Sequence, residues 1–462
     1  MMSKYPKIGV IAAAGKGTRA YPRSTQIHKT VFEIQGKTLL HYNAEILAHQ
    51  LGVEKIYVIA GHLEDQVRVA VKDISGSDLK VDMEVVHWTR GRGLAADIAS
   101  LSGKISQPFY VILGDEFYDK PDHTAFLRFI DSHGDFEAAI GYVHTPHASK
   151  IQKNYSLLLT DDQVQRLVEK PTDLSNDMLG VGSYLLNPSY FDYFEKTPRS
   201  RGSGVVEITY VLDAMAQETG KVFAVPLKSG YFNINTMQDY HQAVYEVRNE
   251  RFDQFSISLV IPGGRKGTST ADVVADFKDK VDEIVVLDGD FTGEQILNGF
   301  DQATGDLVLF VSHDGAYRSK DLPKLLEYMK DSDMVIGTRV TRQMIEQGTN
   351  MSLFVRLLNL FLAKSIDLLW WDRQPCFTDV DCRYFCFWKE TCARLRPEVS
   401  LRSAFPVVEL MIEVIRRHMR CVEIPVSYYK TAETKLGSFW RTCNNVLQIG
   451  WIILKMKFES LL

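Results

Sequence analysis

Short apolar runs alternate with segments of helical periodicity along the first half of the chain. Residues 7–11 and 55–60 are brief, apolar and β-branched, which is typical of strands buried on both faces. Residues 37–51 and 61–71 repeat apolar side chains every three or four positions, which predicts helices. A further strand is predicted at 109–113. This alternation predicts an α/β domain whose ligands bind at the carboxyl ends of parallel strands.

The same alternation starts again in the second half. An apolar strand pattern covers residues 256–262, and similar patterns follow at 283–290 and 305–314. No low-complexity spacer precedes this second series. The pattern therefore predicts two Rossmann-like α/β domains with mostly parallel sheets, residues 1–252 and 253–462.

Composition agrees with two globular domains. The chain has 462 residues, too many for one ordinary core, and its 45% apolar and 24% charged residues are typical of a soluble protein. A net charge of −5 provides no basic field, so we expect no nucleic-acid partner. No signal peptide and no apolar run of ~18 residues are seen, so we expect a cytoplasmic protein without a spanning helix. The six cysteines lack zinc-site spacing, which predicts reduced thiols.

A glycine-rich loop follows the first predicted strand. Gly15 and Gly17 allow backbone N–H groups to approach an anion closely. Lys16, Arg19 and Lys29 supply positive charge beside them. This combination predicts a phosphate-binding loop.

Two later positions carry candidate chemistry. Asp115 stands where an apolar strand ends, and a carboxylate there suits Mg²⁺, although an ordinary strand-end role is the alternative. Gly93 and Leu94 enter a predicted helix with small residues, which would allow a flat base to lie against the backbone; a plain helix start is the alternative.

With the segment Glu169-Lys170-Pro171, these motifs resemble the nucleotidyltransferases that join a nucleoside triphosphate to a sugar 1-phosphate. The resemblance covers residues 5–245 and implies a nucleotide-diphospho-sugar transferase fold. It implies catalytic roles for Arg19, Lys29 and Asp115, nucleotide binding by Ala13, Gly15, Gly17, Thr18, Gly93 and Leu94, and substrate binding by Glu169, Lys170, Gly182 and Glu207.

The implied reaction is attack by a phosphomonoester oxygen on the α-phosphate, with release of pyrophosphate. Lys29 would bridge both substrates, Arg19 would hold the departing phosphates, and Mg²⁺ (or Mn²⁺) at Asp115 would neutralise charge. The family usually has a second metal-binding aspartate where this chain has Asn233, whose carbonyl can coordinate metal without adding charge. A non-sugar phosphomonoester or phosphonate, such as phosphocholine or an inositol phosphate, is therefore the alternative substrate.

The second half resembles a family 2 inverting glycosyltransferase of the polyprenyl-phosphate sugar synthase type, which implies a GT-A-like fold. The matching segments are residues 333–339, 379–384, Glu409, 422–426 and 434–436. The resemblance implies nucleotide binding by Asp288 and Asp314, with Asp314 also a metal ligand. Ser312 replaces the first aspartate of the expected Asp-x-Asp motif. A catalytically weak domain, or a docking or regulatory module, is therefore the alternative.

The two resemblances together imply a bifunctional enzyme. The first domain would make a nucleotide-activated sugar, and the second would pass the glycosyl group to a lipid phosphate or to a cell-surface polysaccharide. Residues 354–371 and 446–454 are apolar with basic neighbours. They either pack on the core or lie as amphipathic helices at the inner face of the membrane. A homo-oligomer is compatible with this interpretation.

Overall fold

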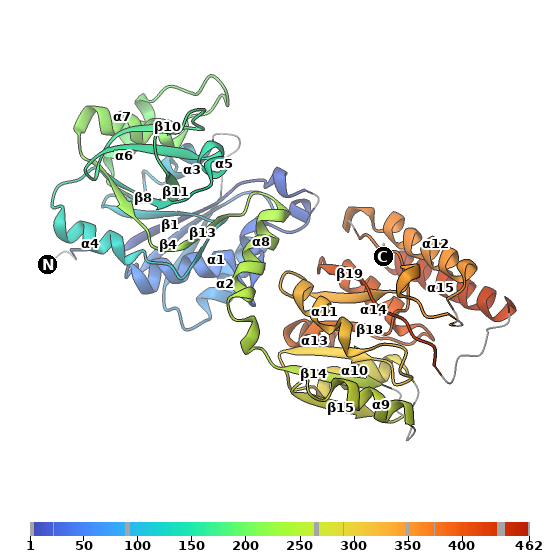
Figure 1. The fold of residues 1–462 in the computed structure, drawn as a ribbon. Coiled ribbons are helices and arrows are strands. Elements are labelled where there is room, and N and C mark those ends of the chain that lie inside the picture. Colours follow the sequence, from blue (N-terminus) through green and yellow to red (C-terminus); the bar gives the residue numbers. More distant parts are fainter. Residues whose placement is uncertain are drawn as a thin grey trace. The chain divides into compact units, whose positions relative to one another are not determined.

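The computed structural model describes residues 4–21, 23–87, 93–262, 268–289, 291–347, 349, 351–373, 375–431 and 439–460 (Figure 1). They form two compact units that divide between Ala243 and Val244. Two of the segments named above lie wholly or partly outside the described residues: Asp290, the last residue of 283–290, and residues 434–436.

The first unit is built on a nine-stranded sheet in the order β5-β4-β1-β6-β11-β8-β12-β10-β9. Its strands are β1 (Ile8–Ala13), β4 (Lys55–Ala60), β5 (Asp82–His87), β6 (Phe109–Leu113), β8 (Ala138–His144), β9 (Tyr155–Thr160), β10 (Gln163–Glu169), β11 (Met178–Leu186) and β12 (Val222–Pro226). The first four strands in that order are parallel, β11 runs antiparallel between β6 and β8, and β12 is parallel to β8. The predicted α/β fold is confirmed, in a sheet that mixes both strand directions.

Two short antiparallel pairs stand apart from this sheet. One joins β2 (Glu33–Ile34) to β3 (Lys37–Thr38), directly after the predicted phosphate loop and Lys29. The other joins β7 (Glu116–Asp119) to β13 (Gly230–Asn233). The second pair brings a segment from the end of the unit to the end of β6.

Helices cover both faces of the first sheet (Figure 1). They are α1 (Leu39–Glu45), α2 (Glu64–Ser75), α3 (Leu94–Ala99), α4 (Thr124–Ser132), α5 (Ala148–Lys153), α6 (Ser189–Lys196) and α7 (Ile208–Thr219), and α8 (Met237–Asn249) follows. Leu40 and Phe126 belong to the core on one face, and Ile98 belongs to the core on the other. Val10 and Ile11 of β1 enter opposite cores, because successive side chains of a strand point to opposite faces.

The second unit has a six-stranded sheet in the order β15-β14-β16-β18-β17-β19. Its strands are β14 (Ile257–Pro262), β15 (Glu283–Leu287), β16 (Leu307–Val311), β17 (Met334–Thr338), β18 (Tyr384–Trp388) and β19 (Cys421–Pro425). Only β18 among them is antiparallel to its neighbours. Strand for strand, this order and these directions repeat those of β4-β1-β6-β11-β8-β12 in the first unit.

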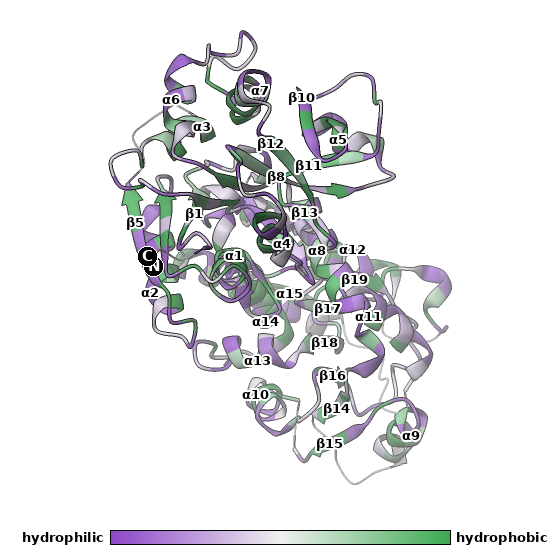
Figure 2. Cartoon of the chain, turned by 90° about the vertical axis from the view of Figure 1, so that its left-hand side faces the viewer, coloured by the Kyte–Doolittle hydropathy of each residue, from purple (hydrophilic) through white to green (hydrophobic). Residues whose placement is uncertain are grey.

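The helices of the second unit pack around one apolar core. They are α9 (Thr268–Phe277), α10 (Gly293–Gln302), α11 (Leu322–Met329), α12 (Leu353–Leu369), α13 (Lys389–Leu395), α14 (Pro406–Arg416) and α15 (Phe439–Glu459). Figure 2 shows hydrophobic residues along the strands and helices of both units. Within the described ranges, no helix combines the length and apolar character needed to cross a bilayer. The cysteines are free, as predicted, and three of them, Cys382, Cys386 and Cys392, are buried.

Candidate active site

The glycine loop lies directly over the side chain of Lys29. Gly17 has a φ of 61°, in the left-handed region that favours glycine, and it precedes the short helical turn Thr18–Ala20. A Cβ atom at Gly17 would lie 3.0 Å from Cγ of Lys29. Gly15, Thr18 and Arg19 are exposed. The loop therefore covers the stem of the lysine and leaves the Arg19 side chain open to a ligand.

Lys29 and Asp115 form the central ion pair of the site. The lysine is 7% exposed, and its Nζ lies 2.5 Å from Oδ2 of Asp115. The same ammonium group donates to the carbonyl of Ile234 at 3.0 Å. The Ile234 N–H in turn donates to the Asp115 carbonyl at 2.9 Å. Three segments far apart in the sequence thus converge on one buried ammonium group.

This pair lies where the sequence predicted it, at the carboxyl ends of parallel strands. Asp115 follows β6, and Ala13 is the last residue of the neighbouring strand β1. The Gly114 N–H donates to the Ala12 carbonyl at 2.9 Å, which holds the two strand ends together. His28, next to Lys29, donates its N–H to Oε1 of Gln66 at 2.8 Å. Both sides of the ion pair are therefore anchored by backbone hydrogen bonds.

Asn233 pairs with Glu116 between β13 and β7, and its side chain belongs to a chain of amide side chains. Its Oδ1 accepts a hydrogen bond from Asn235 at 2.7 Å, and its Nδ2 donates to Asn154 at 3.1 Å. No group of three or more His, Cys, Asp or Glu side chains with metal-binding geometry occurs in the described ranges. Asp115 and the Asn233 carbonyl, which keeps a second lone pair, are oxygen donors that fit Mg²⁺ when substrate phosphates complete the coordination shell.

A buried carboxyl group that sequence reasoning missed lies next to Asp115. Glu116 is 2% exposed and accepts hydrogen bonds from the Tyr118 hydroxyl at 2.5 Å and the Tyr231 hydroxyl at 2.6 Å. Burial raises the pKa of Glu116 to about 7. The only signal in the sequence is a glutamate at the start of an apolar, aromatic strand, Glu116–Asp119.

The structure places Gly182 under this carboxyl group. Its N–H donates to Glu116 at 2.9 Å, so that donor already has a partner. A Cβ atom at Gly182 would lie 2.3 Å from Cγ of Leu113. Gly182 is therefore required for close packing beneath the end of β6.

Three predicted substrate residues, Glu169, Lys170 and Glu207, are brought near one another. Glu169 ends β10, accepts a hydrogen bond from Thr209 at 3.0 Å and pairs with Lys170 at 3.0 Å. Thr209 lies in the first turn of α7, and Glu207 is the residue that precedes this helix. The Lys170 N–H donates to the carbonyl of Asn154 at 2.7 Å. Asn154 thus connects the Glu169–Lys170 segment to Asn233.

The predicted base-binding segment lies against the loop that leads to α7. Gly93 has a φ of 83° and precedes α3, as the sequence predicted. A Cβ atom there would lie 3.1 Å from Cγ2 of Val205. Gly93 and Leu94 are therefore close to the segment that carries Glu207.

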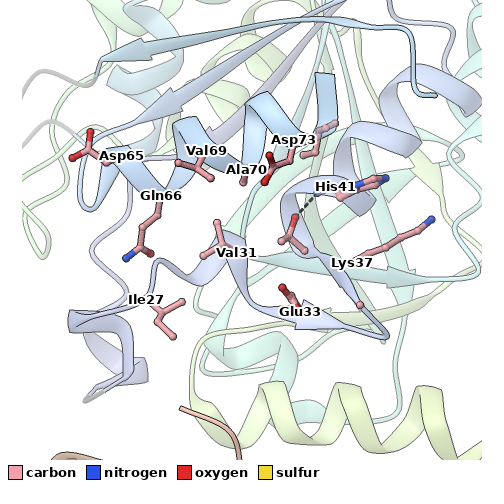
Figure 3. Close-up of a pocket in the computed structure, with 13 residues that line it drawn as sticks. Ile27, Val31, Glu33, Lys37, His41, Asp65, Gln66, Val69, Ala70 and Asp73 are labelled. Atoms are coloured by element: carbon pink, nitrogen blue, oxygen red, sulfur yellow. Dashed lines mark hydrogen bonds between the residues drawn. The ribbon is translucent and has the colours of Figure 1, made fainter. Parts of the chain in front are cut away.

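A separate cavity of about 640 Å³ opens between α2, α1 and the β2–β3 pair (Figure 3). Residues of α2, including Val69 and Asp73, face Val31 and His41 across it. Lys29 and Asp115 do not line it, although Gln66 both lines it and anchors His28. This cavity is thus distinct from the place where the charged residues converge.

In the second unit, the predicted nucleotide residues follow parallel strands. Asp288 is exposed after β15, and its carbonyl accepts a hydrogen bond from Gln295. Asp314 follows β16, and its Oδ1 accepts hydrogen bonds from the Ser312 hydroxyl at 2.6 Å and the Ala316 N–H at 3.1 Å. Strand β14 lies between β15 and β16, and no hydrogen bond is seen between these two described aspartates.

The matching segments of the second unit converge on a buried ion pair that the sequence did not predict. Arg339 binds both carboxylate oxygens of Asp379, at 2.7 and 2.9 Å. Asn359 of α12 donates to Asp379 at 2.8 Å. Glu423 accepts the N–H groups of Thr378 and Asp379, and burial raises its pKa to about 7. The sequence shows these residues in three separate motifs, 333–339, 379–384 and 422–426. Only the fold brings the three motifs into contact. Glu409 lies elsewhere and accepts the Ser403 N–H.

Comparison with known proteins matches the two halves of the chain to two different families. The nucleotidyl transferase family matches residues 8–250, and glycosyl transferase family 2 matches residues 259–385. The UTP–glucose-1-phosphate uridylyltransferase AglF of Haloferax volcanii is 23% identical over 52% of this chain and 96% of its own length. The catalytic subunit beta of mannose-1-phosphate guanylyltransferase from Xenopus tropicalis is 26% identical over 50% of this chain and 62% of its own. A crystal structure of apo UDP-glucose pyrophosphorylase, 21% identical, covers 53% of this chain and 99% of its own with a TM-score of 0.47.

Proposed function

The chain belongs to the nucleotidyl transferase family, and we propose that residues 1–252 transfer a nucleoside monophosphate from a nucleoside triphosphate to a sugar 1-phosphate. The observation that carries this proposal is the Lys29–Asp115 pair beneath the glycine loop. It combines a fixed positive charge, a metal-binding carboxylate and free loop surface at one edge of the sheet. The relatives named above as sugar 1-phosphate transferases support this choice of substrate class.

The reaction would depend on positioning and charge neutralisation. An acceptor phosphate oxygen would form a bond to the α-phosphorus as the bond to pyrophosphate breaks. Lys29 would bridge both phosphate groups through the ammonium proton that neither Asp115 nor the Ile234 carbonyl accepts. Arg19 would neutralise the departing pyrophosphate from the exposed loop. Asp115 and the Asn233 carbonyl would hold Mg²⁺ or Mn²⁺, which supplies further neutralisation of the triphosphate when bound.

The remaining residues would orient the acceptor and the base. Glu169 and Glu207 would accept hydrogen bonds from sugar hydroxyls, and the exposed Lys170 would contact the sugar phosphate. Gly93 and Leu94 would lie against the base, while Ala13, Gly15 and Thr18 would line the phosphate path. We assign Gly182 a packing role beneath this surface, because its N–H already binds Glu116.

A second acceptor class is favoured by Asn233. The amide at this position adds no negative charge and is already bonded to Asn154 and Asn235. A site with less negative charge tolerates a different phosphomonoester, such as phosphocholine, an inositol phosphate or a phosphonate. This alternative keeps the same reaction and changes only the acceptor.

The test is pyrophosphate release measured with each nucleoside triphosphate against glucose 1-phosphate, mannose 1-phosphate, phosphocholine and inositol phosphate. We expect release with a sugar 1-phosphate, and its loss when EDTA removes divalent cations. Release only with phosphocholine or inositol phosphate would favour the second acceptor class. No release with any pair would contradict the proposal.

For the second unit we propose transfer of the glycosyl group to a lipid-phosphate or glycan acceptor. Catalysis would depend on Asp288 and Asp314, which follow the strand ends. Because Ser312 replaces the first aspartate of the expected Asp-x-Asp motif, this unit has fewer carboxylates than the motif would supply. A non-catalytic docking or regulatory module is the alternative, because the Asp314 carboxylate is already bonded within its own turn. Transfer of labelled sugar from the nucleotide sugar to a polyprenyl phosphate distinguishes the two. With a lipid acceptor, we propose a cytoplasmic location peripheral to the inner face of the membrane.

A further inference from the structure

Helices α12 and α15 carry most of the large exposed hydrophobic side chains of the described chain. They lie side by side in the second unit (Figure 1). The large, exposed apolar side chains of α12 and of the short turn that follows it (Trp371–Arg373) are Leu353, Phe354, Leu357, Leu360, Phe361, Leu368 and Trp371. Those of α15 are Trp440, Leu447, Trp451, Leu454 and Phe458. We call these residues the α12–α15 face.

Helical periodicity shows that this face is a second apolar stripe. Each helix already buries one stripe in the core, through Leu362 and Ile366 on α12 and through Ile449 and Ile453 on α15. The exposed residues recur three or four positions apart on the other side, where a surface helix of a globular protein normally carries polar groups. Trp451, for example, is 68% exposed. An apolar area of this kind indicates a binding surface.

Charge and aromatic content indicate what binds there. Each of the two helices contains more basic than acidic residues, although the whole chain has a net charge of −5. Lys364 and Lys455, each close to a carboxylate of its own helix, still have side chains 49% and 60% exposed. Exposed tryptophans beside leucines and lysines match the headgroup region of a bilayer, where an indole ring is apolar on one side and hydrated on the other. A lysine within an apolar stripe can extend its ammonium group to lipid phosphates.

The face is also connected to the buried ion pair of the second unit. From its inner side, α12 presents Asn359 to Asp379 at 2.8 Å, and Arg356 donates to the Val340 carbonyl. Residue 340 follows Arg339 directly in the chain. One helix thus contacts the Arg339–Asp379 pair on one side and carries the exposed apolar stripe on the other.

From these observations we propose that the α12–α15 face inserts into the headgroup region of an anionic lipid bilayer. There it would hold the second unit where a lipid-phosphate acceptor is available. The identity of that acceptor rests on the function proposed above for the second unit, whereas the binding surface does not. A second copy of the chain, the other occupant that would cover such a face, is an outcome of the test.

The test is flotation of the full chain with vesicles of phosphatidylcholine and phosphatidylglycerol, and with vesicles of phosphatidylcholine alone. We expect binding to the anionic vesicles that weakens with salt. The double variant Phe361→Ser with Trp451→Ser should reduce the bound fraction at least about tenfold, because each ring buried in lipid is worth a tenfold change or more. The Lys364→Gln, Lys455→Gln variant should lose mainly the preference for anionic vesicles.

The control is Tyr328→Ser, which removes an aromatic ring that is 49% exposed on α11, outside the face. It should float like the unchanged protein, and all variants should keep their melting temperature and pyrophosphate release. Absence of flotation, or flotation that the double variant retains, would overturn the proposal. So would a dimer in analytical ultracentrifugation that the double variant dissociates, because a second copy would then cover the face. Loss of glycosyl transfer with flotation intact would count against the second-unit function alone.

Discussion

The two units contain the same six-stranded arrangement, yet the residues that follow its third strand make different contacts in each unit. In the first unit, β6 is followed by Asp115, which receives Lys29 and Ile234 from distant segments. In the second unit, β16 is followed by Asp314, whose carboxylate closes a turn with Ser312 and Ala316. The sheet therefore determines where a site can lie. What makes it a phosphate-transfer site is the charge that other segments bring to it.

The units also differ in where they bury charge. The first places an ammonium group at the ends of β1 and β6. The second places its buried ion pair, Arg339 with Asp379, after β17, on the other half of the sheet. The four predictions below test this division, beginning with the largest expected effect.

Asp115→Asn should reduce pyrophosphate release by about a thousandfold, since it removes the carboxylate proposed to bind the metal and the charged partner of Lys29. Asp314→Asn, the corresponding change in the second unit, should leave pyrophosphate release unchanged. The measurement is steady-state release with the best substrate pair. Asp161→Asn is the control, because Asp161 lies in an exposed turn with a φ of 57° that asparagine adopts readily. Equal losses from Asp115→Asn and Asp314→Asn would contradict a site confined to the first unit.

Arg339→Met should destabilise the second unit by about 3–5 kcal/mol, because Asp379 would remain buried without its partner. The first unit should be unaffected, so pyrophosphate release should persist at temperatures below its own unfolding. Denaturant unfolding followed by tryptophan fluorescence measures the change. Combining Arg339→Met with Asp379→Leu should recover part of the loss. If Arg339→Met alone were as stable as the original chain, the Arg339–Asp379 pair would contribute little to the free energy of unfolding.

Gly182→Ala should destabilise the first unit by roughly 1–3 kcal/mol, because the new methyl group would overlap Leu113 and press on Glu116. Gly103→Ala is the matched control, since nothing lies within 4 Å of a Cβ atom there. Melting temperatures of the two variants provide the comparison. Equal melting temperatures would mean that the strands move apart at little cost.

Glu423→Gln should reduce the pH dependence of the free energy of unfolding of the second unit. The pKa of Glu423 is raised from 4.5 to about 7, so the folded state holds its proton more tightly than the unfolded state. Its free energy of unfolding should therefore fall by about 2 kcal/mol between pH 5 and pH 8. Urea unfolding of the Glu423→Gln protein should vary less over this range, whereas exposed Glu398→Gln should behave like the original chain. An unchanged slope in the Glu423→Gln protein would assign the dependence to another group.

Much of the fold, and part of the candidate site, could be predicted from sequence. Apolar runs and helical periodicity located the parallel strands and the edge that carries Lys29 and Asp115, because these signals are local. The burial of Glu116 was not predictable in this way, since it depends on Tyr231 and Gly182 from distant strands. The Arg339–Asp379 pair was missed for the same reason. Each motif was visible in the sequence, but their contact required the order of β17, β18 and β19.

Asn154 of the first unit links two segments that are proposed to bind different substrates. Its side chain accepts a hydrogen bond from Asn233, a proposed metal ligand, and its carbonyl accepts the N–H of Lys170, which is proposed to contact the sugar phosphate. A ligand that tightens one of these bonds lowers the conformational entropy that the other substrate must still lose on binding. We therefore expect the two substrates to bind with positive cooperativity.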